Sequence, residues 1–285
     1  MTSITKMNAA DGMLLAVDTS SSAMSIALTR GPELLGELNS KAERNHSIHL
    51  LPAIRQLLSD AGLHPRDLDA FAVGVGPGSY TGVRIGVTVA KTFAWTHDMA
   101  LLGVSSLEAL ALGGGEAYFR EAAGDSGEAN VSSAEEALGR RNETVWFVPM
   151  FEARRGQAFT ALYQASPQSW SCLVQDGIRL MSSWTEELLK RSAETASGES
   201  AAAKPDRIVF VGETGLHTET LDRFFTAWAG PSGVVDHEMR ARHIAQIGRR
   251  HWREGRIEQA HGLVPNYTQL TEAEVNLAKK SQGGP

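Results

Sequence analysis

Short apolar runs separated by turns open the chain and predict a sheet. Residues 13–17, 23–28 and 33–38 are each mostly apolar, and polar or Gly-Pro turns separate them. Runs of this length are typical of strands, and three in close succession favour an antiparallel meander. Residues 1–12 carry no such run, so we expect a loose extension ahead of the first strand.

The pattern then changes to a helical period. Over residues 46–61, apolar side chains recur at spacings of three and four, and Gly62 is a plausible stop. Residues 70–75 form another apolar run that predicts a buried strand. Ser105 and Glu108 match a capping box, so a helix is expected to begin there.

The second half of the chain alternates between the same two patterns. Two stretches, 113–143 and 192–205, are small and polar without a period, and we interpret them as loops or linkers. Between and after them the predicted strands are 145–150, 158–163, 171–174 and 207–211, and the predicted helices are 183–191, 216–228 and 243–254.

This mixture of strands and helices predicts α/β or α+β layering, and a length of 285 residues predicts roughly two domains or one unit of two lobes. The expected parts are an extension 1–12, an N-terminal lobe 13–112, a loop or insert 113–143, a C-terminal lobe 144–275 whose last helices can pack back on the first lobe, and a tail 276–285.

Composition narrows the classes of protein that fit. Of the 285 residues, 42% are apolar and 21% charged, which is ordinary for a globular protein and excludes a disordered chain or a rod. A net charge of −6 is unusual for a protein that binds nucleic acid with its whole surface. The single cysteine, Cys172, excludes a disulfide framework. With neither a long apolar segment nor a signal-peptide pattern, we expect a cytoplasmic protein that spans no membrane.

A glycine-rich stretch, residues 74–95, is the most informative part of the sequence. Glycines after a strand can form a turn that cradles an anion at a helix N-terminus. The stretch lacks both the Gly-Lys-Ser/Thr of a Walker loop and the GxGxxG fingerprint. We therefore favour a tightly packed turn and keep weak ATP or ADP binding as the alternative. Within this stretch Gly76, Gly78 and Ser79 would contact a phosphate.

Two periods compete within this stretch. Val83, Ile85 and Val87 alternate as in a strand, whereas Gly or Ala recurs every four residues from Gly82 to Ala94 and would form one bare stripe on a helix. Such a stripe admits a close neighbour. We expect another subunit there, with contact inside the same chain as the alternative. The predicted interface comprises Ile48, Leu51, Gly82, Ile85, Gly86, Val89, Ala90, Phe93 and Ala94.

Several motifs in a fixed order resemble one known family. They are Ala16-Val17-Asp18-Thr19-Ser20, the stretch His46 to Pro52, the stretch Gly76 to Gly86, the stretch Gly103 to Ala111 and Ala153-Arg154-Arg155-Gly156. Together they are similar to the TsaB (YeaZ) family, with good coverage of residues 13–112 and patches afterwards, among them Pro265-Asn266-Tyr267. The chain departs from the family at Glu152, where Asp is common, and at Thr268-Gln269, where Leu-Arg is common.

The resemblance implies a two-lobed actin-like ATPase (ribonuclease H-like) fold with mixed sheets flanked by helices. The polar turn Asp18-Thr19-Ser20 after the first strand is then a further candidate for phosphate contact, because the corresponding turn handles phosphate or metal in actin-like ATPases. The resemblance also implies a place in the bacterial machinery that makes threonylcarbamoyladenosine next to the tRNA anticodon. In that machinery the paralogue TsaD is catalytic and the ATPase TsaE assists. This chain is then expected to be a non-catalytic subunit that pairs with TsaD, or with itself when alone, and that meets tRNA indirectly or weakly.

The resemblance also bears on catalysis. The paralogue holds a metal through two histidines four residues apart on one helix. The equivalent positions here are Ser106 and Leu110, and Leu110 has no donor atom. We therefore expect no catalytic and no metal-binding residue. His46 and His49 form a close histidine pair, which we interpret as a helix start rather than a metal site.

A basic region surrounds His243 and His251. We interpret it as a solvated helix face, with contact to tRNA phosphates or an acidic partner as the alternative. Its arginines are Arg240, Arg242, Arg249, Arg250 and Arg253.

Three functions follow from these observations. A scaffold that favours the active state of TsaD ranks first, and it predicts that Gly86→Leu abolishes association while the chain stays folded. An ATPase or phosphotransferase that acts alone through Asp18 and the glycine-rich turn is the alternative. A metallopeptidase ranks last, since the sequence supplies no metal triad.

Overall fold

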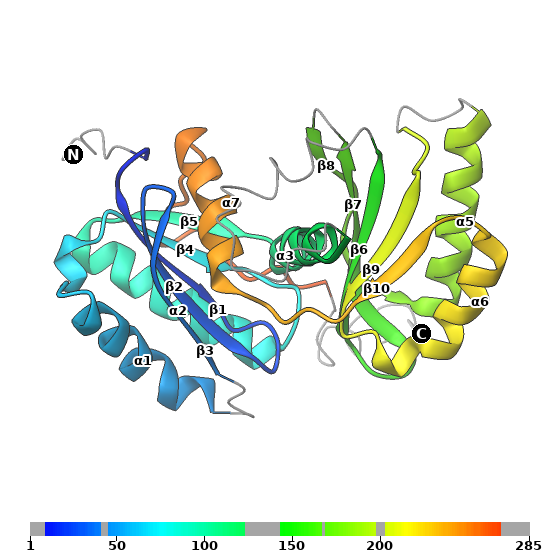
Figure 1. Ribbon diagram of the computed structural model, residues 1–285. Coiled ribbons are helices and arrows are strands. Elements are labelled where there is room, and N and C mark those ends of the chain that lie inside the picture. Colours follow the sequence, from blue (N-terminus) through cyan, green and yellow to red (C-terminus); the bar gives the residue numbers. More distant parts are fainter. Residues whose placement is uncertain (1–8, 41–44, 123–142, 167–168, 198–202, 269–285) are drawn as a thin grey trace, which may run out of the picture.

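Two lobes face each other across one central helix. The computed structural model describes residues 9–40, 45–122, 143–166, 169–197 and 203–268. Each lobe is built on a five-stranded sheet, and helix α3 (Ser106–Ala122) lies between the two sheets (Figure 1). The predicted α/β fold with mixed sheets flanked by helices is confirmed.

The N-terminal sheet grows from the predicted meander. Strands β1, β2 and β3 pair antiparallel, and β4 and β5 add in parallel on the other side of β1. The resulting order is β3-β2-β1-β4-β5. Strand β5 was not among the strands that the pattern predicts. The bounds are β1 Met13–Asp18, β2 Met24–Arg30, β3 Glu33–Ser40, β4 Ala70–Gly74 and β5 Ala100–Val104.

Helices cover both faces of this sheet. Side chains alternate between the faces of a strand, so Leu15 on β1 enters the core under α1 (His46–Asp60) and α2 (Tyr80–His97). Its neighbour Leu14 enters the core under α7 (Ala241–Arg253) on the opposite face. The stretch with two competing periods is thus a helix, α2.

The C-terminal sheet has the order β10-β9-β6-β7-β8. Helices α5 and α6 cover its outer face and enclose a separate core around Trp146, Phe210 and Phe224. The bounds are β6 Val145–Glu152, β7 Gln157–Ser166, β8 Ser169–Leu180, α5 Met181–Ser197, β9 Arg207–Gly212, α6 Thr218–Trp228 and β10 Ser232–Val235, with short 3-10 turns at Pro65–Asp67 (η1) and Gly215–His217 (η2).

Helix α3 corrects the predicted loop at residues 113–143. Residues 113–122 belong to this helix, and residues 123–142 lie outside the described ranges. A Cβ on Gly114 would lie 2.1 Å from Val211 Cγ1, so the glycine lets α3 pack directly on the C-terminal sheet. Likewise, the predicted loop at 192–205 begins as helix, because α5 runs to Ser197.

The two lobes are not consecutive pieces of chain. Helix α7 follows the C-terminal sheet in sequence but packs on β1, β2 and β5 of the N-terminal sheet. The expected division of the chain left this arrangement open for the last helices. One apolar cluster contains Leu14, Phe147 and Ile244, from both sheets and α7. Of the expected loose extension 1–12, residues 9–12 are described and docked, since Arg249 donates to the carbonyl oxygens of Ala9 and Gly12.

None of the helices in the described part of the chain has the length and apolar character that a membrane crossing requires.

Candidate functional site

The bare stripe of α2 faces the sheet of its own chain. A Cβ on Gly82 would lie 2.1 Å from the carbonyl oxygen of Thr19, and a Cβ on Gly86 would lie 2.6 Å from Thr19 Oγ1. Ala90 and Ala94 are buried in the core below α2. The prediction that these four residues contact another subunit is therefore wrong. The close neighbour is the turn after β1, which leaves the helix room only for small residues.

The other residues of the predicted interface lie nearer the surface. Ile48 and Leu51 on α1 are 64% and 50% exposed. Ile85, Val89 and Phe93 on α2 are half-buried and pack against the core that α1 covers. These five residues form an apolar surface where the two helices meet, which we name the α1–α2 face.

Asp18, the carboxylate of the predicted phosphate contact, is fully buried. Its Oδ1 accepts hydrogen bonds from the backbone N–H and hydroxyl of Ser20, at 2.8 and 2.7 Å. Its Oδ2 accepts one from Ser106 Oγ at 2.6 Å. Burial raises the pKa of Asp18, against hydrogen bonds from Ser106 and Ser20 that lower it. Both carboxylate oxygens thus have partners inside the protein.

The glycine-rich turn packs directly on the turn after β1. The N–H of Ser79 donates to the carbonyl of Ser20 at 2.7 Å, and Thr19 Oγ1 donates to the carbonyl of Gly82 at 2.7 Å. A Cβ on Gly78 would lie 2.2 Å from the Ser20 oxygen. The tightly packed turn is confirmed. The two turns fill the space against each other, which disfavours a phosphate between them.

The start of α3 holds Ser106 and Leu110, which the resemblance equates with two metal-binding histidines of the paralogue. Ser106 is buried with its hydroxyl on Asp18, and Leu110 is buried in the core that the lobes share. Ser105 caps the helix by accepting from the Glu108 N–H at 3.1 Å. The carboxylate of Glu108 bonds instead to Trp170 Nε1 and Arg250, so only half of the capping box forms.

The histidine pair of α1 does not converge. His46 is buried and its Nε2 lies 3.1 Å from the carbonyl oxygen of Ser21, whereas His49 is exposed. Among the residues that the structure describes, no three His, Cys, Asp or Glu side chains come together as a metal site would need.

Most arginines of the basic region on α7 bond to groups of the same chain. Arg240 and Arg242 both bind the carboxylate of Glu37 on β3. Arg249 donates to Thr29 Oγ1 and to backbone carbonyls near the N-terminus. With Arg250 on Glu108, most of these arginines hold α7 against the N-terminal lobe. The interpretation as a solvated face is therefore wrong for the buried Arg249, whereas contact of this region with tRNA phosphates stays a prediction.

Sequence reasoning missed a segment that crosses the molecule after α7. We name residues 255–268 the C-terminal strap. The N–H of Glu258 donates to the carbonyl of Leu101 on β5, and the N–H of Asn266 donates to the carbonyl of Val75 after β4, at 2.8 and 2.7 Å. Backbone hydrogen bonds leave no pattern of side chains in the sequence, so only the match at Pro265-Asn266-Tyr267 could have indicated the segment.

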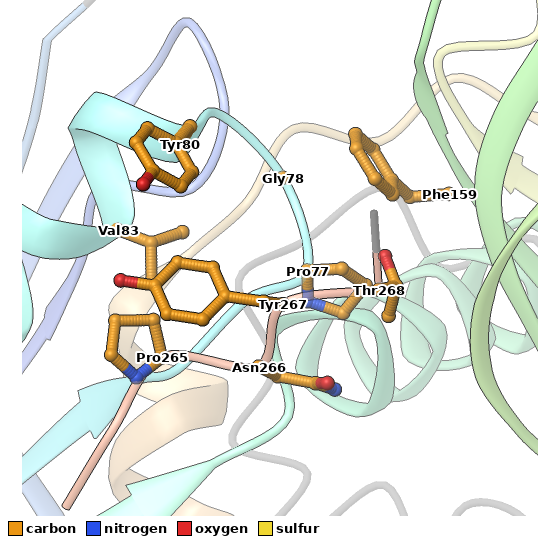
Figure 2. Close-up of a pocket in the computed structure, with 9 residues that line it drawn as sticks. All are labelled: Pro77, Gly78, Tyr80, Val83, Phe159, Pro265, Asn266, Tyr267 and Thr268. Atoms are coloured by element: carbon orange, nitrogen blue, oxygen red, sulfur yellow. The ribbon is translucent and has the colours of Figure 1, made fainter. Parts of the chain in front are cut away.

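The strap also reaches the C-terminal lobe. Asn266 Nδ2 donates to Asp176 Oδ2 on β8 at 3.2 Å, and the same carboxylate accepts from Ser105 and Tyr163. Burial raises the pKa of Asp176, against hydrogen bonds from Ser105, Tyr163 and Asn266 that lower it. Figure 2 shows the small hollow beside this junction, about 340 Å³ including its open mouth, with strap residues 265–268 on one side and Phe159 of β7 on another.

Comparison with known proteins identifies the family. A family model described as TsaD, tRNA N6-adenosine threonylcarbamoyltransferase, matches residues 35–122, which hold α1, α2 and α3. A tRNA threonylcarbamoyladenosine biosynthesis protein TsaB of Haemophilus influenzae is 42% identical over 99 residues, 34% of this chain and 41% of the relative. The solved YeaZ of Pseudomonas aeruginosa has the same fold, with a TM-score of 0.62 and 23% identity over 90% of this chain and 99% of that one.

A relative aligned over nearly its full length settles the assignment. The tRNA threonylcarbamoyladenosine biosynthesis protein TsaB of Bacillus subtilis is 33% identical over 262 residues, 92% of this chain and 96% of the relative. The chain therefore belongs to the TsaB family of tRNA threonylcarbamoyladenosine biosynthesis proteins.

Proposed function

We propose that this chain is a non-catalytic scaffold subunit that binds a TsaD paralogue and favours its active state for threonylcarbamoyl transfer to the adenosine next to the tRNA anticodon. The observation that carries the proposal is the α1–α2 face. It exposes Ile48 and Leu51, and it lies within the stretch 35–122 that matches the TsaD family model.

The shared stretch suggests how the two proteins meet. A partner with related helices presents a related surface, and related surfaces can pack face to face about an approximate two-fold axis, as identical ones do in symmetric dimers. The same face would serve a homodimer when the chain is alone. Binding favours the active state of TsaD to the extent that this state fits the face better than its other states do.

The buried polar groups support a subunit without chemistry of its own. Asp18 has no exposed surface, and both its oxygens accept hydrogen bonds from Ser20 or Ser106. An ATPase that acts alone would need this carboxylate near a nucleotide. Ser106 and Leu110, where the paralogue would hold its metal, are buried in this chain. Threonylcarbamoyl transfer would then take place on TsaD.

The remaining partners fit the same arrangement. Several arginines of the basic region, which was considered as a contact to tRNA phosphates, bind Glu37, Glu108 and backbone carbonyls. We infer that tRNA meets the assembled complex mainly through TsaD. The ATPase TsaE would act on that complex rather than on this chain alone.

Substitution of Leu51 by Asp tests the proposal. A charge at a half-exposed position leaves the fold of the chain intact but must be desolvated when a partner covers it. We expect Leu51→Asp to weaken binding to purified TsaD at least tenfold and to lower tRNA modification by the reconstituted system in proportion. The matched control is Leu216→Asp, since Leu216 in η2 is 81% exposed. Equal binding by Leu51→Asp and the unchanged chain would refute the α1–α2 face as the TsaD contact.

A further inference from the structure

Exposed apolar side chains gather on the flank of α2 that faces away from α1. Two belong to α2 itself, Tyr80 and Trp95, which are 44% and 72% exposed. Two belong to the C-terminal strap, Val264 and Tyr267, which are 66% and 47% exposed. We name these four residues the strap strip. None of them was part of the interface that the sequence predicts.

The strap is held along α2 as a fixed part of its surface. Near the end of α2 the ring of Trp95 meets the ring of His261 edge to face, with 5.5 Å between the ring centroids. Near the start of α2, Arg84 donates to Tyr267 Oη at 2.7 Å. The strap therefore runs antiparallel to the helix. Between these points Lys91 Nζ donates to the carbonyl oxygen of Leu263 at 2.9 Å. The guanidinium of Arg84 also lies 3.8 Å from the centre of the Tyr80 ring.

The outward ridge of α2 connects the strap strip to the α1–α2 face. Its exposed residues between the two include Thr81, Thr88 and Thr92. The hydroxyl of Thr92 donates to the carbonyl oxygen of Thr88 at 2.9 Å, so this donor is already satisfied within the helix. The nearest cations, Arg84 and Lys91, bond to the strap. The Thr92 hydroxyl and the two cations therefore already have hydrogen-bond partners before another protein covers this ridge.

The size of the α1–α2 face indicates that a partner must cover more than that face. A specific interface of standard size buries roughly 800 Å² on each partner, from about 20 to 30 residues. The α1–α2 face offers two strongly exposed apolar side chains, Ile48 and Leu51, and three that are already half-buried. The strap strip is a further apolar surface that extends this face across the ridge of α2.

We propose that the strap strip is the second half of the docking surface for the TsaD partner, so that one subunit covers α1, the ridge of α2 and the strap together. The inference rests on the proposed function, because it takes the occupant of the α1–α2 face as the occupant of the strip. Trp95 is the expected anchor, since Trp is enriched among the residues that dominate binding energy in interfaces.

Two substitutions on the strip test it by titration calorimetry against purified TsaD. Trp95→Ser and Val264→Ser remove exposed apolar surface, so both variants are expected to fold with unchanged circular dichroism and melting temperature. We expect Trp95→Ser to raise the Kd at least tenfold and Val264→Ser to raise it about threefold. Leu216→Ser, the matched change on an exposed leucine of the C-terminal lobe, should leave the Kd unchanged.

Hydrogen exchange of the complex separates this inference from the proposed function. Protection of the strap amides as well as those of α1 and α2, together with the affinity losses, supports the strip. Protection confined to α1 and α2, with less than twofold effects of both strip variants, overturns the strip and leaves the scaffold role standing. Binding to TsaD with no new protection on α1, α2 or the strap overturns both the strip and the α1–α2 face as contact surfaces.

Discussion

At Gly86 the backbone of α2 comes so close to the first sheet that a side chain has no space. An added Cβ would lie 2.6 Å from Thr19 Oγ1 and 3.5 Å from Val73 Cγ2. Thr19 cannot retreat, because its hydroxyl donates to the carbonyl of Gly82 and it is itself buried. The glycine is therefore needed for packing within the chain.

We expect Gly86→Leu to destabilise the fold rather than to release a partner from a chain of unchanged stability. Leucine favours a helix over glycine by about 1 kcal/mol, but overpacking a rigid site typically costs about 1–3 kcal/mol and more where backbone must move. A net loss of up to roughly 2 kcal/mol in the free energy of unfolding, and more if the backbone must move, should appear in urea titration. Thr88→Leu, on the exposed side of the same helix, is the control. A midpoint for Gly86→Leu equal to that of the unchanged chain would contradict this packing.

Glu37 shows how one buried carboxylate fixes an element. Its side chain is 4% exposed, and it accepts from the guanidinium groups of Arg240 and Arg242. Burial alone would raise the pKa of Glu37, but the hydrogen bonds from Arg242 and Arg240 outweigh it and lower the pKa. The carboxylate on β3 thereby holds the start of α7.

The lowered pKa of Glu37 predicts a dependence of stability on pH. A group whose pKa is lower in the folded state stabilises the fold above its unfolded pKa, and this contribution disappears as the pH falls through the folded pKa. We expect Glu37→Gln to lower the free energy of unfolding by roughly 2 kcal/mol at pH 7, as for hydrogen bonds to charged groups. The gap to the unchanged chain should narrow below about pH 4. Glu33→Gln, exposed on the same strand, serves as control, and a gap that stays constant down to pH 3 would contradict this role.

At the scale of elements, apolar runs and a regular helical period were predictable, whereas a helix without a polar face and irregular segments were not. Strands β1 and β2 are buried on both faces, so they appear in the sequence as mostly apolar runs. Helix α1 buries one face, so its apolar positions follow the period of a helix. Helix α3 is buried on nearly all sides from Ser106 to Gly115, so it has no polar face and its glycines resemble a loop. The two residues of the predicted interface that belong to α1, Ile48 and Leu51, lie at the surface. The stripe of α2 was misassigned because small residues indicate a close neighbour without indicating which one.

The strap could not be predicted because backbone hydrogen bonds and a few long side chains hold it. Lys91 is its main anchor on α2. We expect Lys91→Met to free the strap locally, so that the amides of Glu258 and Asn266 exchange faster while the melting temperature changes little. Lys190→Met, at an exposed lysine of α5, controls for the loss of one charge. Unchanged exchange at both amides would show that the strap does not depend on this lysine.

At the scale of the molecule, the lobes form one body. The cluster that contains Leu14, Phe147 and Ile244 runs from one sheet to the other, and Asn266 bonds to both lobes. A boundary between residues 112 and 144 therefore divides the sequence into two parts, but the hydrophobic cluster that both sheets share extends across it. The two sheets are expected to lose structure together rather than as two domains.

The return of α7 also dictates an order of events at the ribosome. The strands of the first sheet leave the exit tunnel early, but Leu14, Ala16 and Ala27 become buried only when Ile244 and its neighbours on α7 pack on them. Until α7 has been synthesised, the nascent chain thus exposes an apolar surface that chaperones can bind.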